Sequence, residues 1–372
     1  MKKNLRVLLF LVFSSFMYIN ADNIPVDGYG DNSLNKFDRL IKAYMTKNEI
    51  PGASVAITKD SRLVYAKGFG YTDLKKEMAK PHSLFKIASL SKSITAAAVL
   101  QLVEQGRISL DDKVVSVLDI KPYSSDKFLD DRWKAITVKH LLQHEAGWTR
   151  KDDPMFRLKN IAKSMNIKKL PTSKELISYL MDKQLSFSPG EHYSYSNFGY
   201  IVLGRIIEKV TNTDYESYVN SNILKPLGIS RMKIGDKILD STGGWLASAT
   251  DIIRFMSSFD NPDSSKILKK STIDMMFLRK KGPSGYTNGI EKKIYYSFGW
   301  MVKTHGYAKD TYHTGSLSDA STMMIRRYDG VNWVVLFNKK ENDKKQKLAP
   351  MIEWSFDKLI KSTKHWPEED LF

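Results

Sequence analysis

The sequence predicts a mixed α/β fold of the α+β type, in which one antiparallel sheet combines strands from both ends of the chain. Strand patterns occur at 53–58 and 63–70, and return at 295–304, 311–315, 321–328 and 333–338. The part between them, about 107–260, has helical spacing interrupted by proline and glycine. We therefore expect helices to flank the sheet, a second and mostly helical lobe, and a site in the cleft between the lobes.

Each terminal element follows from its local pattern. Apolar residues at helical spacing predict a helix over 34–48, which Pro51-Gly52 ends. A turn at 59–62 separates the first two strands. A second helix runs from Ser89 to Gln105, where Gly106 stops it, and a final helix covers about 348–361.

The N-terminus has the pattern of a signal peptide over residues 1–21. Basic residues precede a short apolar run from 7 to 19, and the small residue Ala21 follows. The run is too short to favour a stable transmembrane span, although an uncleaved anchor is the alternative. We expect an exported protein, periplasmic or secreted. Its parts are a mobile leader at 22–33, one domain at 34–362 and a C-terminal tail at 363–372. Within the domain, the α/β lobe takes 34–106 and 261–362, and the helical lobe 107–260.

Composition excludes several classes of function. The chain has no cysteine, so disulfides, a thiol nucleophile and cysteine-bound metals are ruled out. The net charge is +17, but lysine and arginine are scattered and not interleaved with aromatic residues, which argues against a nucleic-acid partner. A basic exported protein is attracted to anionic surfaces such as cell-wall polymers.

The first chemical motif is Ser89-x-x-Lys92 at the start of the second helix. A spacing of three places both side chains on one helical face. A serine hydroxyl needs a nearby base to become a nucleophile, and a lysine of lowered pKa is such a base. The alternative is a helix-capping serine beside an exposed lysine. The small apolar residues at 94–99 predict a buried helix, which favours the chemical interpretation.

Two further motifs contain polar residues beside turns. Tyr195 and Asn197 follow Pro189-Gly190 and precede a helix, so the phenol is a candidate acid or base and the amide a candidate substrate ligand. Taken alone, the residue types favour the alternative of a structural tyrosine and a helix-capping asparagine. The third motif, His313-Thr314-Gly315-Ser316, lies in a strand in which the glycine indicates a close approach of other chain atoms or a ligand.

In this order and at this separation, the three motifs resemble the serine β-lactamase and penicillin-binding protein superfamily. The nearest group contains class C β-lactamases, D-Ala-D-Ala carboxypeptidases and esterases. Segments 136–148, 226–229 and 243–248 also resemble that group, and the likeness covers about residues 34–340. It implies one β-lactamase-related catalytic domain that needs no cofactor and no metal.

The resemblance also implies a role for each motif residue. Ser89 would be acylated, while Lys92 and Tyr195 share the proton transfers, with the general base left open between them. Asn197 would hold the substrate amide and Lys92. His313, Thr314 and Gly315 would contact the substrate, and the backbone N–H groups of Ser89 and Ser316 would form the oxyanion hole.

His313 stands where many relatives have the lysine of a Lys-Thr-Gly motif. A histidine is mostly neutral above about pH 6.5, so a carboxylate anchor here would be weak and pH-dependent. We therefore expect carboxylate-dependent activity to rise on acidification toward pH 6. The same residue argues against efficient β-lactam hydrolysis.

Several alternatives stay open at this stage. The expected partner is a small-molecule or peptide substrate, with D-Ala-D-Ala-type peptides first, broad ester substrates or weak β-lactamase activity next, and cell-wall peptidoglycan as a candidate source. A non-catalytic cell-wall-peptide binding protein is the alternative from another class. A zinc site at His140, His144 and Glu145 is disfavoured, because the His-Glu-x-x-His order is missing. The oligomeric state is left open.

Overall fold

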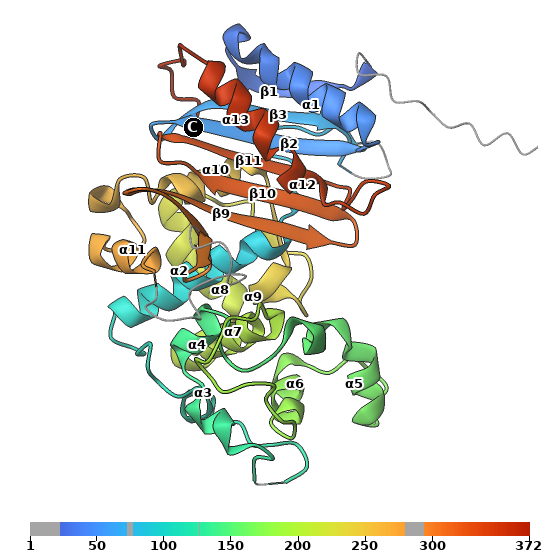
Figure 1. The fold of residues 1–372 in the computed structure, drawn as a ribbon, viewed down its shortest axis with the longest axis vertical. Helices are drawn as coiled ribbons and strands as arrows, with labels where there is room; N and C mark the ends of the chain where they lie inside the picture. The colour runs from blue at the N-terminus through green and yellow to red at the C-terminus, as the bar shows by residue number, and fades with distance from the viewer. Residues whose placement is uncertain (1–22, 73–76, 126, 280–293) are drawn as a thin grey trace, which may run out of the picture.

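An eight-stranded antiparallel sheet forms one lobe of the protein (Figure 1). The computed structural model describes residues 23–72, 77–125, 127–279 and 294–372, so the expected signal peptide lies outside the described residues. The strand order is β1-β3-β2-β11-β10-β9-β8-β7, which places strands from the start of the chain beside strands from its end, as predicted. The strand bounds are β1 Val26–Gly30, β2 Gly52–Lys59, β3 Arg62–Gly70, β7 Ile294–Tyr296, β8 Met301–His305, β9 Ala308–Leu317, β10 Ala320–Arg326 and β11 Val331–Phe337.

Helices cover both faces of this sheet, which explains why β2 and β11 are buried along nearly their whole length. On one face lie the terminal helices, and Trp333 of β11 stacks there on Phe356 with ring centroids 4.5 Å apart. On the other face lies a larger core that continues into the helical lobe. The terminal helices are α1 Asn35–Lys47, α12 Leu348–Met351 and α13 Glu353–Ser362.

The second lobe is mostly helical, as the sequence predicts (Figure 1). The long helix α2 lies between it and the sheet and is buried around its whole circumference. The helices of this part are α2 Ser91–Glu104, α3 Val114–Leu118, α4 Val138–Leu142, α5 Leu158–Ser164, α6 Ser173–Leu180, α7 Asn197–Thr211, α8 Tyr215–Val219 and α9 Asp240–Gly243.

The lobe boundary differs from the prediction. Helix α10 (Ala249–Ser257), expected in the helical lobe, packs on β2 and β11 of the sheet. The apolar face of an amphipathic helix can be covered by a sheet or by other helices, and sequence periodicity does not distinguish the two. Helix α11 (Lys270–Met276) follows it in the chain.

The prediction of a mobile leader at 22–33 needs a correction. Residues 26–30 form β1, which pairs antiparallel with β3 as the edge strand of the sheet. The glycines that suggested a mobile segment are required by this pairing, since a Cβ at Gly28 would lie 2.2 Å from the carbonyl oxygen of Ala66.

The long strand predicted at 295–304 is two strands, β7 and β8, joined by a turn. The N–H of Ser297 donates to the carbonyl oxygen of Trp300 at 2.8 Å, and Gly299 takes a φ of +79°. A Cβ at Gly299 would lie 2.6 Å from that of Ala96, so the turn sits directly on α2. A second, small sheet was not predicted. Its strands, in order, are β4 Phe85–Lys86, β6 Trp245–Ala247 and β5 Lys233–Ile234.

The C-terminal tail at 363–372 has no regular structure but is held against the molecule. The N–H of Leu371 donates to the carbonyl oxygen of Leu63 at 2.9 Å, and the guanidinium of Arg254 lies 4.2 Å from the ring of Phe372. None of the helices in the described part of the chain is long and apolar enough to cross a bilayer.

Candidate active site

Ser89 lies in a tight turn at the start of α2. Ala88 has a left-handed φ of +50°, a 3-10 turn (Ala88–Leu90) follows, and the α-helix begins at Ser91. The turn is fixed from both sides, because the carbonyl of Ile87 accepts from the hydroxyl of Thr322 at 2.9 Å and the hydroxyl of Ser91 donates to the carbonyl of Ala88 at 2.7 Å. A left-handed alanine is strained, and such strain is common where a side chain is presented for chemistry.

Lys92 is fully buried one turn along the same helix. Its Nζ lies 3.2 Å from Oγ of Ser89, 2.9 Å from Oδ1 of Asn197 and 2.8 Å from the carbonyl oxygen of Thr242. Burial lowers the pKa of Lys92 well below its ordinary value, and the charge of Arg150 lowers it further, while Asp153 acts in the opposite direction. All three of these partners are neutral oxygens, so no carboxylate contacts the amine directly.

Tyr195 reaches the same hydroxyl from the loop before α7. Its phenol is hydrogen-bonded to Ser89, and its ring centroid lies 4.9 Å from Nζ of Lys92. Burial raises the pKa of Tyr195, against the smaller effects of the Ser89 hydrogen bond and of Arg150. The phenol is therefore protonated at neutral pH. The structure thus brings Ser89, Lys92 and Tyr195 together, as the motifs predict.

Asn197 is the first residue of α7 and is held by a carboxylate that the sequence did not point to. Its backbone N–H donates to Oδ2 of Asp153, which is fully buried and also accepts from the N–H of Met155 at 3.0 Å. Burial raises the pKa of Asp153 despite these hydrogen bonds. Asp153 lies 44 residues before Asn197, and no spacing pattern links the two.

His313 differs from its expected role. It is 2% exposed, its Nδ1 donates to the carbonyl oxygen of Thr314 at 2.7 Å, and its Nε2 accepts from the hydroxyl of Tyr296 at 3.2 Å. Burial and the charge of Lys92 lower the pKa of His313 to about 3. The ring is therefore neutral at pH 6 with both nitrogens occupied, so His313 gives no reason for carboxylate binding to rise toward pH 6. The sequence does not show that this side chain is buried, and burial is what lowers its pKa.

Gly315 confirms the close approach that a glycine in this strand predicted. A Cβ there would lie 2.3 Å from Oγ1 of Thr322 and 2.7 Å from the carbonyl oxygen of Ile87, so only glycine lets β9 lie against the nucleophile turn. Ser316 follows on β9. Beyond it, a hollow of about 320 Å³ lies between the end of β9 and the 243–246 segment, lined by Gly243, Leu246, Leu317, Ser318 and Asp319 among others.

The two histidines of the alternative zinc site have separate structural partners. Nδ1 of His140 accepts from the N–H of Thr137 in the capping box of α4. Nδ1 of His144 accepts from the N–H of Ser196 at 3.1 Å, and its ring lies 4.3 Å from that of Tyr195. His144 is therefore packed in the structure beside Tyr195.

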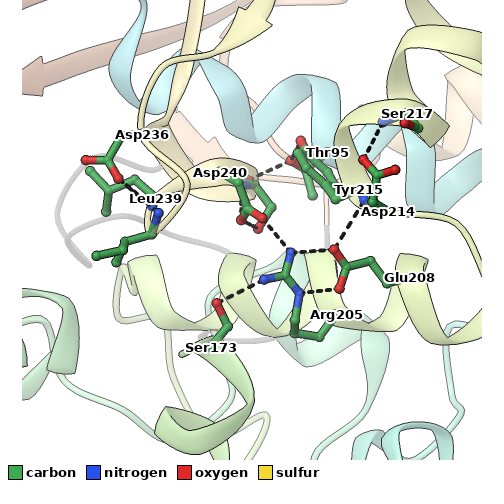
Figure 2. A network of polar contacts seen from close by, with 12 residues as sticks. Thr95, Ser173, Arg205, Glu208, Asp214, Tyr215, Ser217, Asp236, Leu239 and Asp240 are labelled. Carbon is green, nitrogen blue, oxygen red and sulfur yellow. Dashed lines mark hydrogen bonds and ion pairs between the residues drawn. The ribbon is translucent and has the colours of Figure 1, made fainter. Parts of the chain in front are cut away.

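A buried polar network holds α9, which carries the Thr242 carbonyl (Figure 2). Arg205 of α7 donates to Oδ2 of Asp240 at 2.5 Å, pairs with Glu208 at 2.9 Å and donates to Ser173 at 2.9 Å. The other oxygen of Asp240 accepts from the N–H and the hydroxyl of Ser241. The sequence identified segment 243–248 only by resemblance; the structure shows that the residues just before it fix Lys92.

Comparison with known proteins shows the family of this chain. A family model described as Beta-lactamase matches residues 37–356, and the chain belongs to that family. Protein flp of Staphylococcus aureus (strain N315) is 27% identical over 79% of this chain, and the match spans 61% of that protein. Penicillin-binding protein 4* of Bacillus subtilis (strain 168) is 26% identical over 84% of this chain and 73% of its own length. The chain thus spans about three fifths of the flp length.

Solved structures show the same fold. An octameric penicillin-binding protein homologue from Pyrococcus abyssi is 28% identical, with a TM-score of 0.71 over 91% of this chain and 79% of that one. A D-amino acid amidase from Ochrobactrum anthropi SV3 has a TM-score of 0.66 at 19% identity, over 84% of this chain and 96% of that one. The family and the fold support a serine hydrolase.

Proposed function

We propose that the protein hydrolyses D-Ala-D-Ala-type peptides through an acyl-enzyme on Ser89, in the manner of a carboxypeptidase. The observation that carries the proposal is the buried contact of 3.2 Å between Nζ of Lys92 and Oγ of Ser89. The two other hydrogen bonds of this amine go to neutral acceptors, Asn197 and Thr242, which leaves it free to take a proton.

The geometry supports a division of the proton transfers. Lys92, whose pKa burial lowers, accepts the hydroxyl proton as Ser89 attacks the carbonyl carbon. Tyr195, whose pKa burial raises, holds a proton near Ser89 and gives it to the leaving nitrogen, and the proton held on Lys92 then restores the phenol. Water releases the acyl group by the reverse route. The backbone N–H groups of Ser89 and Ser316 would stabilise the oxyanion, an effect worth about 10²–10³ in rate per donor.

The alternative is a broad esterase, with weak β-lactamase activity as a further possibility. One observation favours it: β9 presents a buried, neutral His313 where many relatives have a lysine for the substrate carboxylate. An ester needs no such anchor. We also propose export on the basis of the 1–21 pattern, which would place the protein beside cell-wall peptides.

Three substrates tested side by side distinguish these activities: an N-acyl-D-Ala-D-Ala peptide, a p-nitrophenyl ester and a chromogenic cephalosporin. We expect release of D-alanine from the peptide, and fluorophosphonate labelling that Ser89→Ala abolishes. The matched control is Ser164→Ala, which removes an exposed hydroxyl on α5 and should leave labelling unchanged. Ester turnover without peptide turnover favours the esterase. Peptide binding without labelling or turnover indicates a non-catalytic binding protein.

A further inference from the structure

Arg150 lies beside Tyr195. It begins a short 3-10 turn (Arg150–Asp152), its side chain is exposed, and its guanidinium carbon lies 5.2 Å from the ring centroid of Tyr195. Its backbone N–H donates to the hydroxyl of Ser194 at 3.1 Å, which fixes the start of the turn. Among the side chains that the structure describes, no carboxylate forms a salt bridge with this guanidinium.

The charge of Arg150 reaches the catalytic groups. It contributes to lowering the pKa of Lys92 and that of His144, in both cases after the larger effect of burial. It also acts across the site on Lys347, in the segment between β11 and α12, whose pKa is lowered by burial and then by Arg150. Two cations from remote segments, Arg150 and Lys347, are therefore close enough to affect each other's charge, an arrangement that favours an anion near them.

The strand opposite supplies no such charge. His313 is buried, neutral and hydrogen-bonded through both nitrogens to Tyr296 and Thr314. A substrate carboxylate would therefore find no cation at the position where many relatives have lysine. An exposed arginine has no desolvation cost before substrate arrives. Its guanidinium is held by the contact with the ring of Tyr195, and its planar pair of N–H donors suits bidentate binding of a carboxylate.

We propose that Arg150 binds the free carboxylate of the substrate leaving group, and so takes over the task that His313 cannot perform. The ligand class is a peptide ending in a free carboxylate, such as an N-acyl-D-alanyl-D-alanine. The inference rests on the proposed function, because it assigns the specificity of the same Ser89 site. Arg150 is a specificity-determining residue and takes no part in the proton transfers.

The test compares N-acyl-D-Ala-D-Ala with its C-terminal amide, which differs only in the carboxylate. For Arg150→Met we expect kcat/KM for the acid to fall by about ten- to a hundredfold, mainly through KM, and kcat/KM for the amide to change by less than about threefold. Arg150→Lys should recover part of the preference. The matched control is Lys151→Met, which removes the same charge from the next, exposed residue and should leave the acid-to-amide ratio unchanged.

A second measurement does not depend on turnover. In a Ser89→Ala background, the dissociation constants of the acid and the amide are measured by calorimetry with and without Arg150→Met. Loss of the acid preference with Arg150 supports the proposal even if the peptide is never cleaved. Equal losses for acid and amide, or an unchanged ratio, overturn it. Failure of wild-type labelling by a fluorophosphonate would instead count against the proposed function, so the two failures are distinguishable.

Discussion

Lys92 is a cationic side chain in a place that stabilises its neutral form. It is fully buried, and its hydrogen-bond partners Ser89, Asn197 and Thr242 all present neutral oxygens. Asp153 is near enough to raise the pKa of Lys92, but burial acts more strongly in the opposite direction. An amine held in this way is ready to accept a proton from serine. Removing the amine from water costs free energy, which lowers the stability of the folded protein.

This cost makes stability depend on pH. The amine has a pKa of about 10.4 when unfolded, and burial lowers the pKa of Lys92 in the folded protein. Between these two pKa values the unfolded chain binds the extra proton, so the free energy of unfolding rises with pH, by at most about 1.4 kcal/mol per unit. Lys92→Met should abolish this contribution. Urea unfolding from pH 7 to 10 should show the wild type gaining stability relative to the variant.

The control for this measurement is Lys174→Met, on an exposed site of α6 whose ammonium is solvated in both states. Its stability difference from the wild type should not change over the same pH range. If the Lys92→Met difference were equally constant, Lys92 would keep its proton in the folded protein, and the assignment of this amine as the base would be lost.

His313 shows the opposite case, a residue that looks exchangeable with the lysine of relatives and is not. In His313→Lys an ammonium would replace a ring that accepts from Tyr296 and is 2% exposed. We expect a loss of about 2–4 kcal/mol in the free energy of unfolding by urea at pH 7. His192→Lys, at an exposed histidine, should cost less than about 0.5 kcal/mol. A His313→Lys protein of normal stability with improved carboxylate binding would contradict the structure.

At the scale of elements, the site depends on the fit between α7 and α9. Helix α7 carries Asn197 at its start, and further along presents Gly204 to Ser241 of α9. The salt bridge between Arg205 and Asp240 holds the same two helices together (Figure 2). Because the carbonyl of Thr242 accepts from Lys92, any shift of α9 is transmitted to this amine.

Gly204→Ala tests this fit. Its Cβ would lie 2.4 Å from the hydroxyl oxygen and 2.7 Å from Cβ of Ser241, so α9 must move, at a cost of about 1–3 kcal/mol in unfolding free energy. The rate of fluorophosphonate labelling should fall as well. Ser241→Gly in the same protein should restore both in part. The matched control is Gly199→Ala on the same helix, where the nearest atom is 3.7 Å away and no loss is expected. Normal labelling of the Gly204→Ala variant would show that the position of α9 does not affect the reactivity of Ser89.

How far the elements follow from sequence depends on how they are stabilised. Strands β2 and β11 and helix α2 were predicted because their apolar residues alone indicate burial. Strand β1 was not, because its glycines serve a close approach to β3 that only the assembled sheet reveals. The break between β7 and β8 follows from contact with α2, which lies about 200 residues earlier in the chain.

At the scale of the whole molecule, the site shows the same distinction between local patterns and contacts that only the assembled fold creates. Ser89, Lys92, Tyr195 and Asn197 stand in local motifs and were predicted. The residues that contact them come from remote segments, namely Asp153, Thr242 and Arg150, and Tyr296 does the same for His313. No spacing rule joins these residues to the motifs, because they meet only when the two lobes close on α2. Charge shows the same limit, since burial decided the state of His313.

The C-terminal segment 363–372 offers a test of how the molecule is closed, because it contacts the cores on both faces of the sheet. Trp366 packs against the core under α1 and α13, whereas Leu371 and Phe372 pack against the core of the opposite face. In Figure 1 the C-terminus lies on the sheet, away from the helical lobe.

Deleting residues 364–372 should therefore lower the free energy of unfolding by about 2–4 kcal/mol, through lost apolar burial and the two main-chain contacts of Leu63, and leave fluorophosphonate labelling unchanged. Trp354→Ala, at a side chain 73% exposed on α13, is the control and should cost little. If the shortened chain is as stable as the full chain, the segment does not contribute to stability. If the shortened chain folds but is not labelled, the contacts of the segment with the sheet affect the reactivity of Ser89.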